Sequence, residues 1–200
     1  MAAALADALI AALERRRASG ERCAAADAAE RVLAQVAGWG ASRALLADHP
    51  LVDELGLPAA LAGAGVEPIR WPGPRDPRDG DAWRGLLGLE GPETTCGVTV
   101  PAWGVAERGT LVLEAGAGHG RAIDVASAYH LALLPAGRVV RTLEEALLAT
   151  YAPGRRPPSA VSLVSGPSRT SDIEKISTLG AHGALALHVL VLDGEAPPAA

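Results

Sequence analysis

The segment of residues 161–183 constrains the fold of this 200-residue chain more than any other. The apolar run at residues 161–164 predicts a short buried strand, and a glycine–proline pair at residues 166–167 ends it because proline lacks the N–H that a β-ladder needs. Ser171 and Glu174 have the spacing of a capping box, which predicts a helix starting at Ser171. A strand, a polar turn and a short helix in this order are where open α/β sheets bind their ligands.

The rest of the chain repeats this alternation of strands and helices, which predicts one α/β fold with a mostly parallel sheet. Residues 1–40 are predicted to form an N-terminal helical arm, residues 41–194 the α/β domain, and residues 195–200 a flexible tail. Further helices are predicted at residues 3–18, 24–36, 51–61, 102–107 and 143–151, and strands at residues 43–47, 66–71, 95–99, 110–114, 131–134, 139–141 and 188–192.

Composition excludes several classes of function. The net charge is −5 and the sole basic run is residues 15–17, whereas nucleic-acid binding requires a clustered cationic face. Cys23 and Cys96 are the only cysteines, and their spacing fits neither a disulfide framework nor a metal site. We therefore expect no nucleic-acid partner, no metal and no iron–sulfur cluster held by this chain.

The sequence also predicts a cytoplasmic protein without a membrane span. No window approaches the ~20 consecutive apolar residues that a transmembrane helix requires. The first apolar stretch contains Asp7, and its arginines follow it, which is the reverse of the order in a signal peptide.

Carboxylates near the predicted helix start suggest which ligand it would take. Glu174 points away from Asp172 on a helix and serves mainly as the cap, so Asp172 is the carboxylate that can face a cleft. Two carboxylates at a helix N-terminus disfavour an anion. Ser168, Thr170 and Asp172 would therefore suit hydroxyls, amines or a metal ion.

His182 and Glu107 are the other candidates for proton transfer. His182 stands between Gly180 and Gly183, and a tight turn there would expose an imidazole with a near-neutral pKa; a histidine that only stabilises a helix C-terminus is the alternative. Glu107 precedes Gly109 at a predicted turn and could reach the same cleft, or it could be an ordinary surface residue.

Several motifs lack the spacing that their chemistry needs. The glycines at residues 116–120 do not fit a dinucleotide-binding loop, so a plain turn is favoured there. Lys175 is the only lysine and lies within a predicted helix, which excludes a Walker-type loop, and no nucleophile-elbow sequence occurs. His49, His119 and His130 do not have zinc-ligand spacing.

Three stretches of this chain resemble the signature of the LUD domain family, in particular its lactate utilisation protein C members. They are Gly166-Pro-Ser-Arg-Thr-Ser-Asp-Ile-Glu174, Gly180-Ala-His-Gly183 and Leu187-His-Val-Leu-Val-Leu-Asp193. The resemblance covers residues 94–194. The chain departs from the family pattern at Arg108, where threonine is usual, and at Tyr129 or His130, where an arginine is common.

This resemblance implies an open α/β sheet with helices on both faces, similar to ribose-phosphate isomerases, sugar-phosphate isomerases and CoA transferases. It also implies a role in the oxidation of L-lactate to pyruvate, as the subunit without iron–sulfur clusters that assembles with iron–sulfur partners. The alternative is a stand-alone small-metabolite enzyme that performs proton-transfer chemistry. The predicted catalytic residues are Asp172, His182 and Glu107, and the predicted ligand-binding residues are Gly109, Thr110, Gly166, Ser168, Thr170, Ser171, Glu174 and Gly183.

Overall fold

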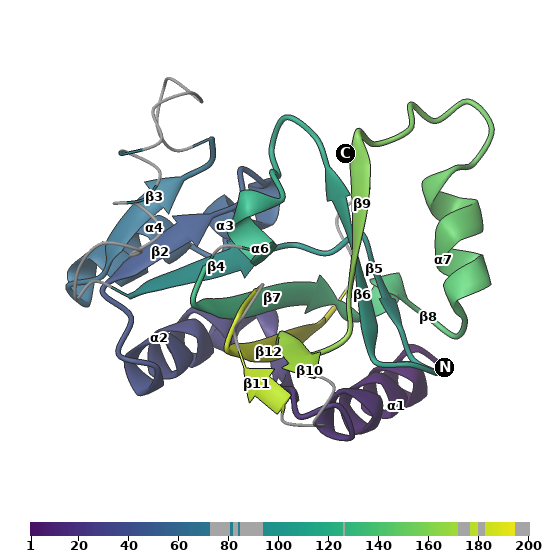
Figure 1. The fold of residues 1–200 in the computed structure, drawn as a ribbon, viewed down its shortest axis with the longest axis horizontal. Coiled ribbons are helices and arrows are strands. Elements are labelled where there is room, and N and C mark those ends of the chain that lie inside the picture. Colours follow the sequence, from purple (N-terminus) through teal and green to yellow (C-terminus); the bar gives the residue numbers. More distant parts are fainter. Residues whose placement is uncertain are drawn as a thin grey trace.

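Two β-sheets form the framework of the protein in the computed structural model (Figure 1). The structure describes residues 1–72, 81, 84, 94–125, 127–171, 177–179 and 183–194. The predicted tail at residues 195–200 lies outside the described residues.

The main sheet has six strands in the order β1-β12-β7-β4-β2-β3, and each of its five strand pairings is parallel. This confirms the α/β fold with a parallel sheet that the alternation of elements predicts. Its strands are β1 (Ser19–Ala24), β2 (Arg43–Leu46), β3 (Glu67–Arg70), β4 (Thr95–Thr99), β7 (Tyr129–Pro135) and β12 (Ala186–Asp193).

Both faces of the main sheet are covered, and the side chains of β7 alternate between them. Leu131 and Leu133 pack with α2 (Ala28–Gly38), α3 (Pro50–Glu54) and α4 (Leu57–Gly63) on one face. Ala132 and Leu134 pack with α1 (Ala2–Glu14) on the other face. Burial on both sides explains why β7 reads as a nearly continuous apolar run in the sequence.

A second sheet of four strands, in the order β8-β5-β6-β9, lies against the α1 face of the main sheet. Leu111 of this sheet packs toward the main sheet, while Val112 packs against Ala146 of α7 on its outer side. The second sheet is therefore the middle layer between the main sheet and α7. Its elements are β5 (Trp103–Val105), β6 (Thr110–Ala115), β8 (Val139–Val140), β9 (Ala160–Val164) and the covering helix α7 (Leu143–Thr150).

One prediction in this second sheet is wrong, and another is right only in part. The helix predicted at residues 102–107 is strand β5, which forms an antiparallel hairpin with β6 through Gly109. The strand predicted at residues 161–164 exists as part of β9, but it is a partly exposed edge strand, and Leu163 retains 48% of its accessible surface. The partner of β9 is β6, which lies far away in sequence, so local pattern does not reveal this pairing.

The helix predicted from Ser171 is also wrong. Arg169–Ser171 form β10 and Ser177–Leu179 form β11, and the two strands pair antiparallel as a hairpin. Ser171 pairs with Ser177 in an extended strand and so is not the N-cap of a helix. The argument that a helix N-terminus here disfavours anions fails with the helix.

The N-terminal 40 residues contribute a strand as well as the two helices that the sequence predicts. β1 adds to the edge of the main sheet by pairing with β12, so α1 and α2 are joined to the sheet rather than forming a separate arm. The polar sequence of β1 hides it, although charged side chains are usual on an edge strand. Arg22 of β1 also pairs with Asp193 of β12 at 2.7 Å.

The helix predicted at residues 51–61 is two helices, α3 and α4, because Gly56 adopts a left-handed conformation with φ of 62°. The helix predicted at residues 143–151 is confirmed as α7, and Thr142 and Glu145 form its capping box. None of the helices in the described part of the chain is long and apolar enough to cross a membrane.

Candidate functional site

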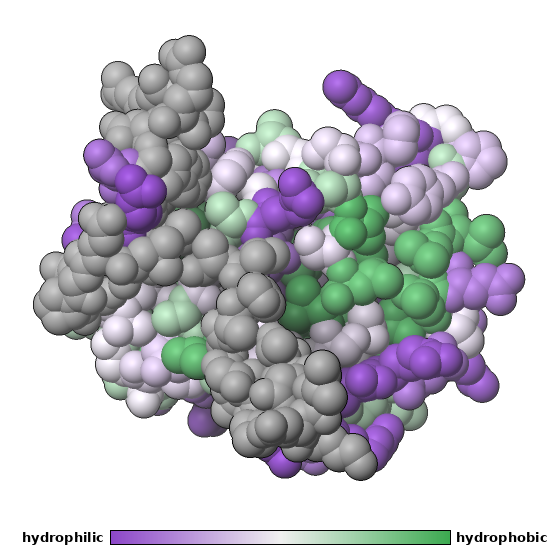
Figure 2. Space-filling view, in the orientation of Figure 1, coloured by the Kyte–Doolittle hydropathy of each residue, from purple (hydrophilic) through white to green (hydrophobic). Residues whose placement is uncertain are grey.

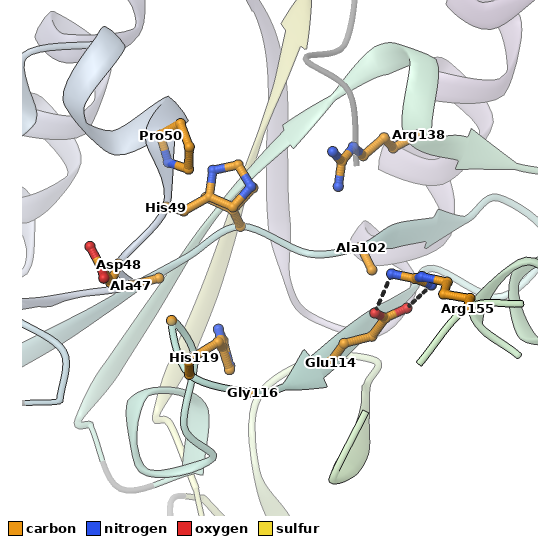
Figure 3. Close-up of a pocket in the computed structure, with 13 residues that line it drawn as sticks. Ala47, Asp48, His49, Pro50, Ala102, Glu114, Gly116, His119, Arg138 and Arg155 are labelled. Atoms are coloured by element: carbon orange, nitrogen blue, oxygen red, sulfur yellow. Dashed lines mark hydrogen bonds and ion pairs between the residues drawn. The ribbon is translucent and has the colours of Figure 1, made fainter. Parts of the chain in front are cut away.

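A cavity of about 290 Å³ opens where β2 and β4 end (Figure 3). After β2, the next strand of the main sheet is β3, which lies on one side. After β4, the next strand of the main sheet is β7, which lies on the opposite side. The crevice between the carboxyl ends of two such strands is where open α/β sheets bind ligands. The cavity is lined by Ala47, Asp48, His49, Pro50, Val100, Ala102, Glu114, Gly116, Ala117, Gly118, His119, Arg138 and Arg155.

An ion pair between Arg155 and Glu114 forms one wall of the cavity. The guanidinium donates to both carboxylate oxygens, at 2.9 Å and 2.7 Å, and Thr150 Oγ1 donates to the same carboxylate at 2.8 Å. This planar, bidentate geometry fixes the Arg155 head group at the cavity surface.

Arg138 extends toward the cavity from the same side (Figure 3). It is only 9% exposed, and this burial lowers its pKa, which the carboxylate of Glu114 partly offsets. An arginine keeps its charge under such conditions because its ordinary pKa is above ~12. The guanidinium groups of Arg138 and Arg155 therefore both lie on this wall of the cavity.

Asp48, His49 and His119 form the opposite wall (Figure 3). His49 caps α3 by accepting a hydrogen bond from the Leu51 N–H at 3.1 Å. Burial lowers the pKa of His49, and the charge of Arg138 lowers it further, so this imidazole is neutral at pH 7. Asp48 is neutralised by Arg70, whose Nη1 lies 2.6 Å from its carboxylate.

His119 is held in a tight turn and contacts a buried carboxylate. Its carbonyl accepts the Gly116 N–H at 2.9 Å. A Cβ on Gly118 would lie 2.3 Å from the Asp48 carbonyl oxygen, so only glycine allows the turn to pack this closely. His119 Nε2 lies 3.4 Å from Oδ1 of Asp124, which belongs to α6 (Ala122–Val125).

Comparison with known families agrees with this architecture. The sequence model of the LUD domain matches residues 6–192. The chain belongs to the LUD domain family.

Two proteins show how much of this chain its relatives match in sequence. "Lactate utilization protein C" from Halalkalibacterium halodurans is 29% identical over 159 residues, which cover 78% of this chain and 65% of that protein. "Uncharacterized protein YkgG" from Escherichia coli is 34% identical over 100 residues, which cover 48% of this chain and 43% of that protein. The chain thus spans less than two thirds of the length of these relatives.

A solved structure supports the LUD-domain fold. The crystal structure of a DUF162 family protein from Deinococcus radiodurans matches with a TM-score of 0.64 and 18% sequence identity. The match covers 97% of this chain and 99% of that one. At this level of identity the likeness concerns the fold alone.

Three of the residues predicted to bind ligand in this LUD domain line a second, smaller cavity of about 220 Å³. They are Gly166, Ser168 and Gly183, and Asp124 and His130 line it with them. The segments that contain Gly166 and Gly183 meet where the Ser168 N–H donates to the Ala184 carbonyl at 2.9 Å. These residues of the LUD signature therefore gather beside α6 and the start of β7.

The predicted residues at the β5–β6 turn lie elsewhere. Glu107 lines a separate cavity of about 310 Å³ with Ala12 of α1 and with residues that follow this helix, and its Oε1 lies 3.4 Å from Nε of Arg108. Gly109 packs against α1, where an added Cβ would lie 2.7 Å from backbone atoms. Thr110 Oγ1 is 2.7 Å from Ser165 Oγ, next to the second cavity.

The remaining predicted residues are not placed by the structure. Asp172, Glu174 and His182 lie outside the described residues, so their convergence in a cleft stays a prediction. Thr170 and Ser171 are described as backbone in the β10–β11 hairpin. In the described part of the LUD domain, no three His, Cys, Asp or Glu side chains group as a metal site would require.

Sequence reasoning missed the main cavity of this LUD domain, although two signals for it were present. Asp48 and His49 follow directly on a buried strand, which is where parallel sheets carry ligand-binding side chains. The glycine-rich segment at residues 116–120 is interpreted from the sequence as a plain turn, because its spacing does not match a nucleotide-binding loop. Its role is to bring His119 to the cavity wall.

Proposed function

We propose that this LUD-domain protein takes part in lactate utilisation and that its main cavity binds a small carboxylate such as lactate or pyruvate. The observation that carries the proposal is a cavity of about 290 Å³ at the carboxyl ends of β2 and β4, which Arg138 and Arg155 line together with two histidines. The names of relatives such as the Halalkalibacterium halodurans protein support the pathway.

The cavity has the chemistry that a 2-hydroxy or 2-oxo acid requires. A guanidinium binds a carboxylate through two parallel hydrogen bonds, and burial strengthens the attraction. His49 and His119 stand on the opposite wall, where an imidazole can donate to or accept from the oxygen on the neighbouring carbon. A volume of about 290 Å³ is at the lower end of the range for ligand sites, so the cavity suits a small metabolite.

The binding prediction concerns Arg155. Replacing it with glutamine removes one guanidinium and leaves Glu114 unpaired in the cavity wall, where its charge repels an anion. We expect Arg155→Gln to weaken the binding of L-lactate or pyruvate at least tenfold, which corresponds to ~1.4 kcal/mol. Isothermal titration calorimetry measures both dissociation constants.

Arg156→Gln is the matched control, since Arg156 is the next residue, is exposed and does not line the cavity. It should bind both acids as the wild type does. Absence of binding by the wild type, or equal dissociation constants for both variants, would contradict the proposal.

We further propose a specific role in lactate utilisation. The protein supports the oxidation of L-lactate to pyruvate as the subunit without iron–sulfur clusters. An exposed apolar surface over α7 supports a subunit role (Figure 2), because such patches are unusual on isolated proteins. Leu148 of this helix is 68% exposed, and Tyr151, which caps its C-terminus, is 55% exposed.

The assembly prediction is that this chain co-elutes with the iron–sulfur proteins of the same lactate system in size-exclusion chromatography. Replacing Leu148 and Tyr151 with serine is expected to reduce the co-eluting fraction, because it removes the apolar surface without touching the core. Separate elution of the wild-type proteins at micromolar concentrations would contradict the subunit role.

A second candidate function is a small-metabolite enzyme that transfers protons. The contact between His119 and Asp124 favours it, since a histidine oriented by a buried carboxylate is a common general base. The two functions share the same cavity and the same carboxylate ligand.

A further inference from the structure

The second cavity, of about 220 Å³, has apolar walls and a polar inner end. Leu163 and Val164 line it from the end of β9, and Leu187 lines it from the start of β12. Leu163 is 48% exposed and so lies at the mouth. Asp124 and His130, which line the same cavity, are only 4% and 1% exposed and lie at its inner end.

His130 faces this cavity because side chains alternate along β7. His130 and Ala132 are two residues apart in this strand, so they project to the same face of the main sheet. Ala132 packs on that face with Leu111 of the second sheet. His130 Nε2 lies 2.7 Å from Thr99 Oγ1, whereas Nδ1 is buried and has no hydrogen-bond partner. One ring nitrogen of His130 is therefore unused.

Asp124 also has an unpartnered atom here. Its side chain has no exposed surface, Oδ1 lies 3.4 Å from His119 Nε2, and Oδ2 has no hydrogen-bond partner. Burial lowers the pKa of His130 to about 4, and the charge of Asp124 partly opposes this shift, which shows that the two groups are close together. A buried carboxylate is costly unless a cation or hydrogen-bond donors compensate it.

The third unpartnered atom of this region is the hydroxyl oxygen of Ser127, which is also buried. A Cβ on Gly97 would lie 2.9 Å from this oxygen, and Gly97 pairs with His130 across β4 and β7. The described part of the chain has five buried side-chain atoms without a partner, and three of them therefore gather at this place. Buried polar atoms are normally hydrogen-bonded, so such a cluster calls for a ligand that supplies the missing bonds.

All three atoms can accept a hydrogen bond. An ionised carboxylate only accepts, a serine oxygen has lone pairs, and His130 Nδ1 accepts when the ring hydrogen is on Nε2 and is donated to Thr99. No arginine or lysine is among the described residues that line the cavity. A cation with several N–H groups therefore fits better than a hydroxyl, which brings one donor and no charge, or an anion, which Asp124 repels.

We propose that the second cavity binds the ammonium group of a small primary amine, with Asp124 as its counter-ion. The three N–H groups of the ammonium donate to Asp124 Oδ2, Ser127 Oγ and His130 Nδ1. The carbon chain lies against Leu163 and Leu187 on the way to the mouth. A volume of about 220 Å³ is below the ~300 Å³ at which ligand pockets usually begin, which restricts the amine to a few carbon atoms.

The experiment compares n-propylammonium with 1-propanol and propionate, which have the same number of carbon atoms, in NMR titrations of the full chain at neutral pH. We expect saturable binding of n-propylammonium, and binding of the alcohol and the acid that is weaker by at least about tenfold. Asp124→Asn keeps the shape of the side chain and removes its charge, so it should weaken n-propylammonium by a similar factor.

Asp7→Asn is the matched control, because Asp7 is exposed and lines neither cavity. It should bind n-propylammonium as the wild type does. Absence of saturable binding by the wild type, or equal binding of n-propylammonium and 1-propanol, would overturn the site without any variant. Wild-type affinity of folded Asp124→Asn would also overturn it. Binding of L-lactate in the main cavity is measured separately, so failure of either site leaves the other unaffected.

Discussion

Acidification from pH 6.5 to pH 4 is expected to remove about 3 kcal/mol of folding free energy through His130 alone, at ~1.4 kcal/mol for each pH unit. His130 is buried at the start of β7, where its Nε2 lies 2.7 Å from Thr99 Oγ1. Burial lowers its pKa from 6.5 to about 4, despite a smaller opposing effect of Asp124. The folded protein therefore keeps this imidazole neutral where the unfolded chain protonates it.

The sign of the effect follows from proton binding. Above pH 6.5 His130 is neutral in both states, and its full contribution to stability is present. As the pH falls from 6.5 to about 4, the unfolded state binds a proton that the folded state does not, so stability declines. Below about pH 4 both states are protonated and the loss is complete.

Urea unfolding of the wild type and His130→Gln between pH 7.5 and pH 4 measures the effect. The glutamine amide can replace Nε2 as the partner of Thr99 and does not titrate. We expect the free energy of unfolding to fall less steeply for the variant. His188, whose pKa burial also lowers, is present in both proteins and cancels in the difference. Parallel pH profiles would show that His130 does not titrate as its burial requires.

The parallel strands were the most predictable part of the fold. β2, β4, β7 and β12 are buried on both faces, so each reads as a short apolar run that no polar residue interrupts for long. One of the missed strands, β1, owes its existence to a partner distant in sequence. β1 is polar but completes the edge beside β12, more than 160 residues away. The strand propensity of the residues of β1 does not reveal the stabilisation that pairing with β12 provides.

The main cavity was less predictable than the fold for a related reason. Its walls come from the end of β2, the end of β6, the residue that precedes β8 and the loop after α7. Arg155 lies in a sequence of prolines and arginines typical of a surface loop, and its pairing with Glu114 becomes visible only once α7 and β6 are packed together. The signature residues at 166–183, in contrast, stand out in sequence and line a neighbouring cavity where they are described.

Gly97→Ala is expected to destabilise the protein by about 3 kcal/mol, the upper range for inserting a methyl group into a packed core. Gly97 lies in the central strand β4, beneath α6. An added Cβ would be 2.1 Å from the Ile123 carbonyl oxygen and 2.9 Å from Ser127 Oγ. The first of these is backbone, so the methyl group can be accommodated only if α6 moves away from the sheet.

Movement of α6 would also carry Asp124 away from His119. Ile123 and Ser127, which the added Cβ would meet, stand on either side of Asp124 in the sequence. Gly38→Ala is the matched control: Gly38 ends α2, is exposed, and has open space where the Cβ would lie. It should be neutral or stabilising by about 0.5–1 kcal/mol. Thermal and urea unfolding compare the stabilities of the two variants. Equal stability of the two alanine variants would mean that α6 does not rest on β4 as closely as the structure shows, and the position of Asp124 beside His119 would then lose its support.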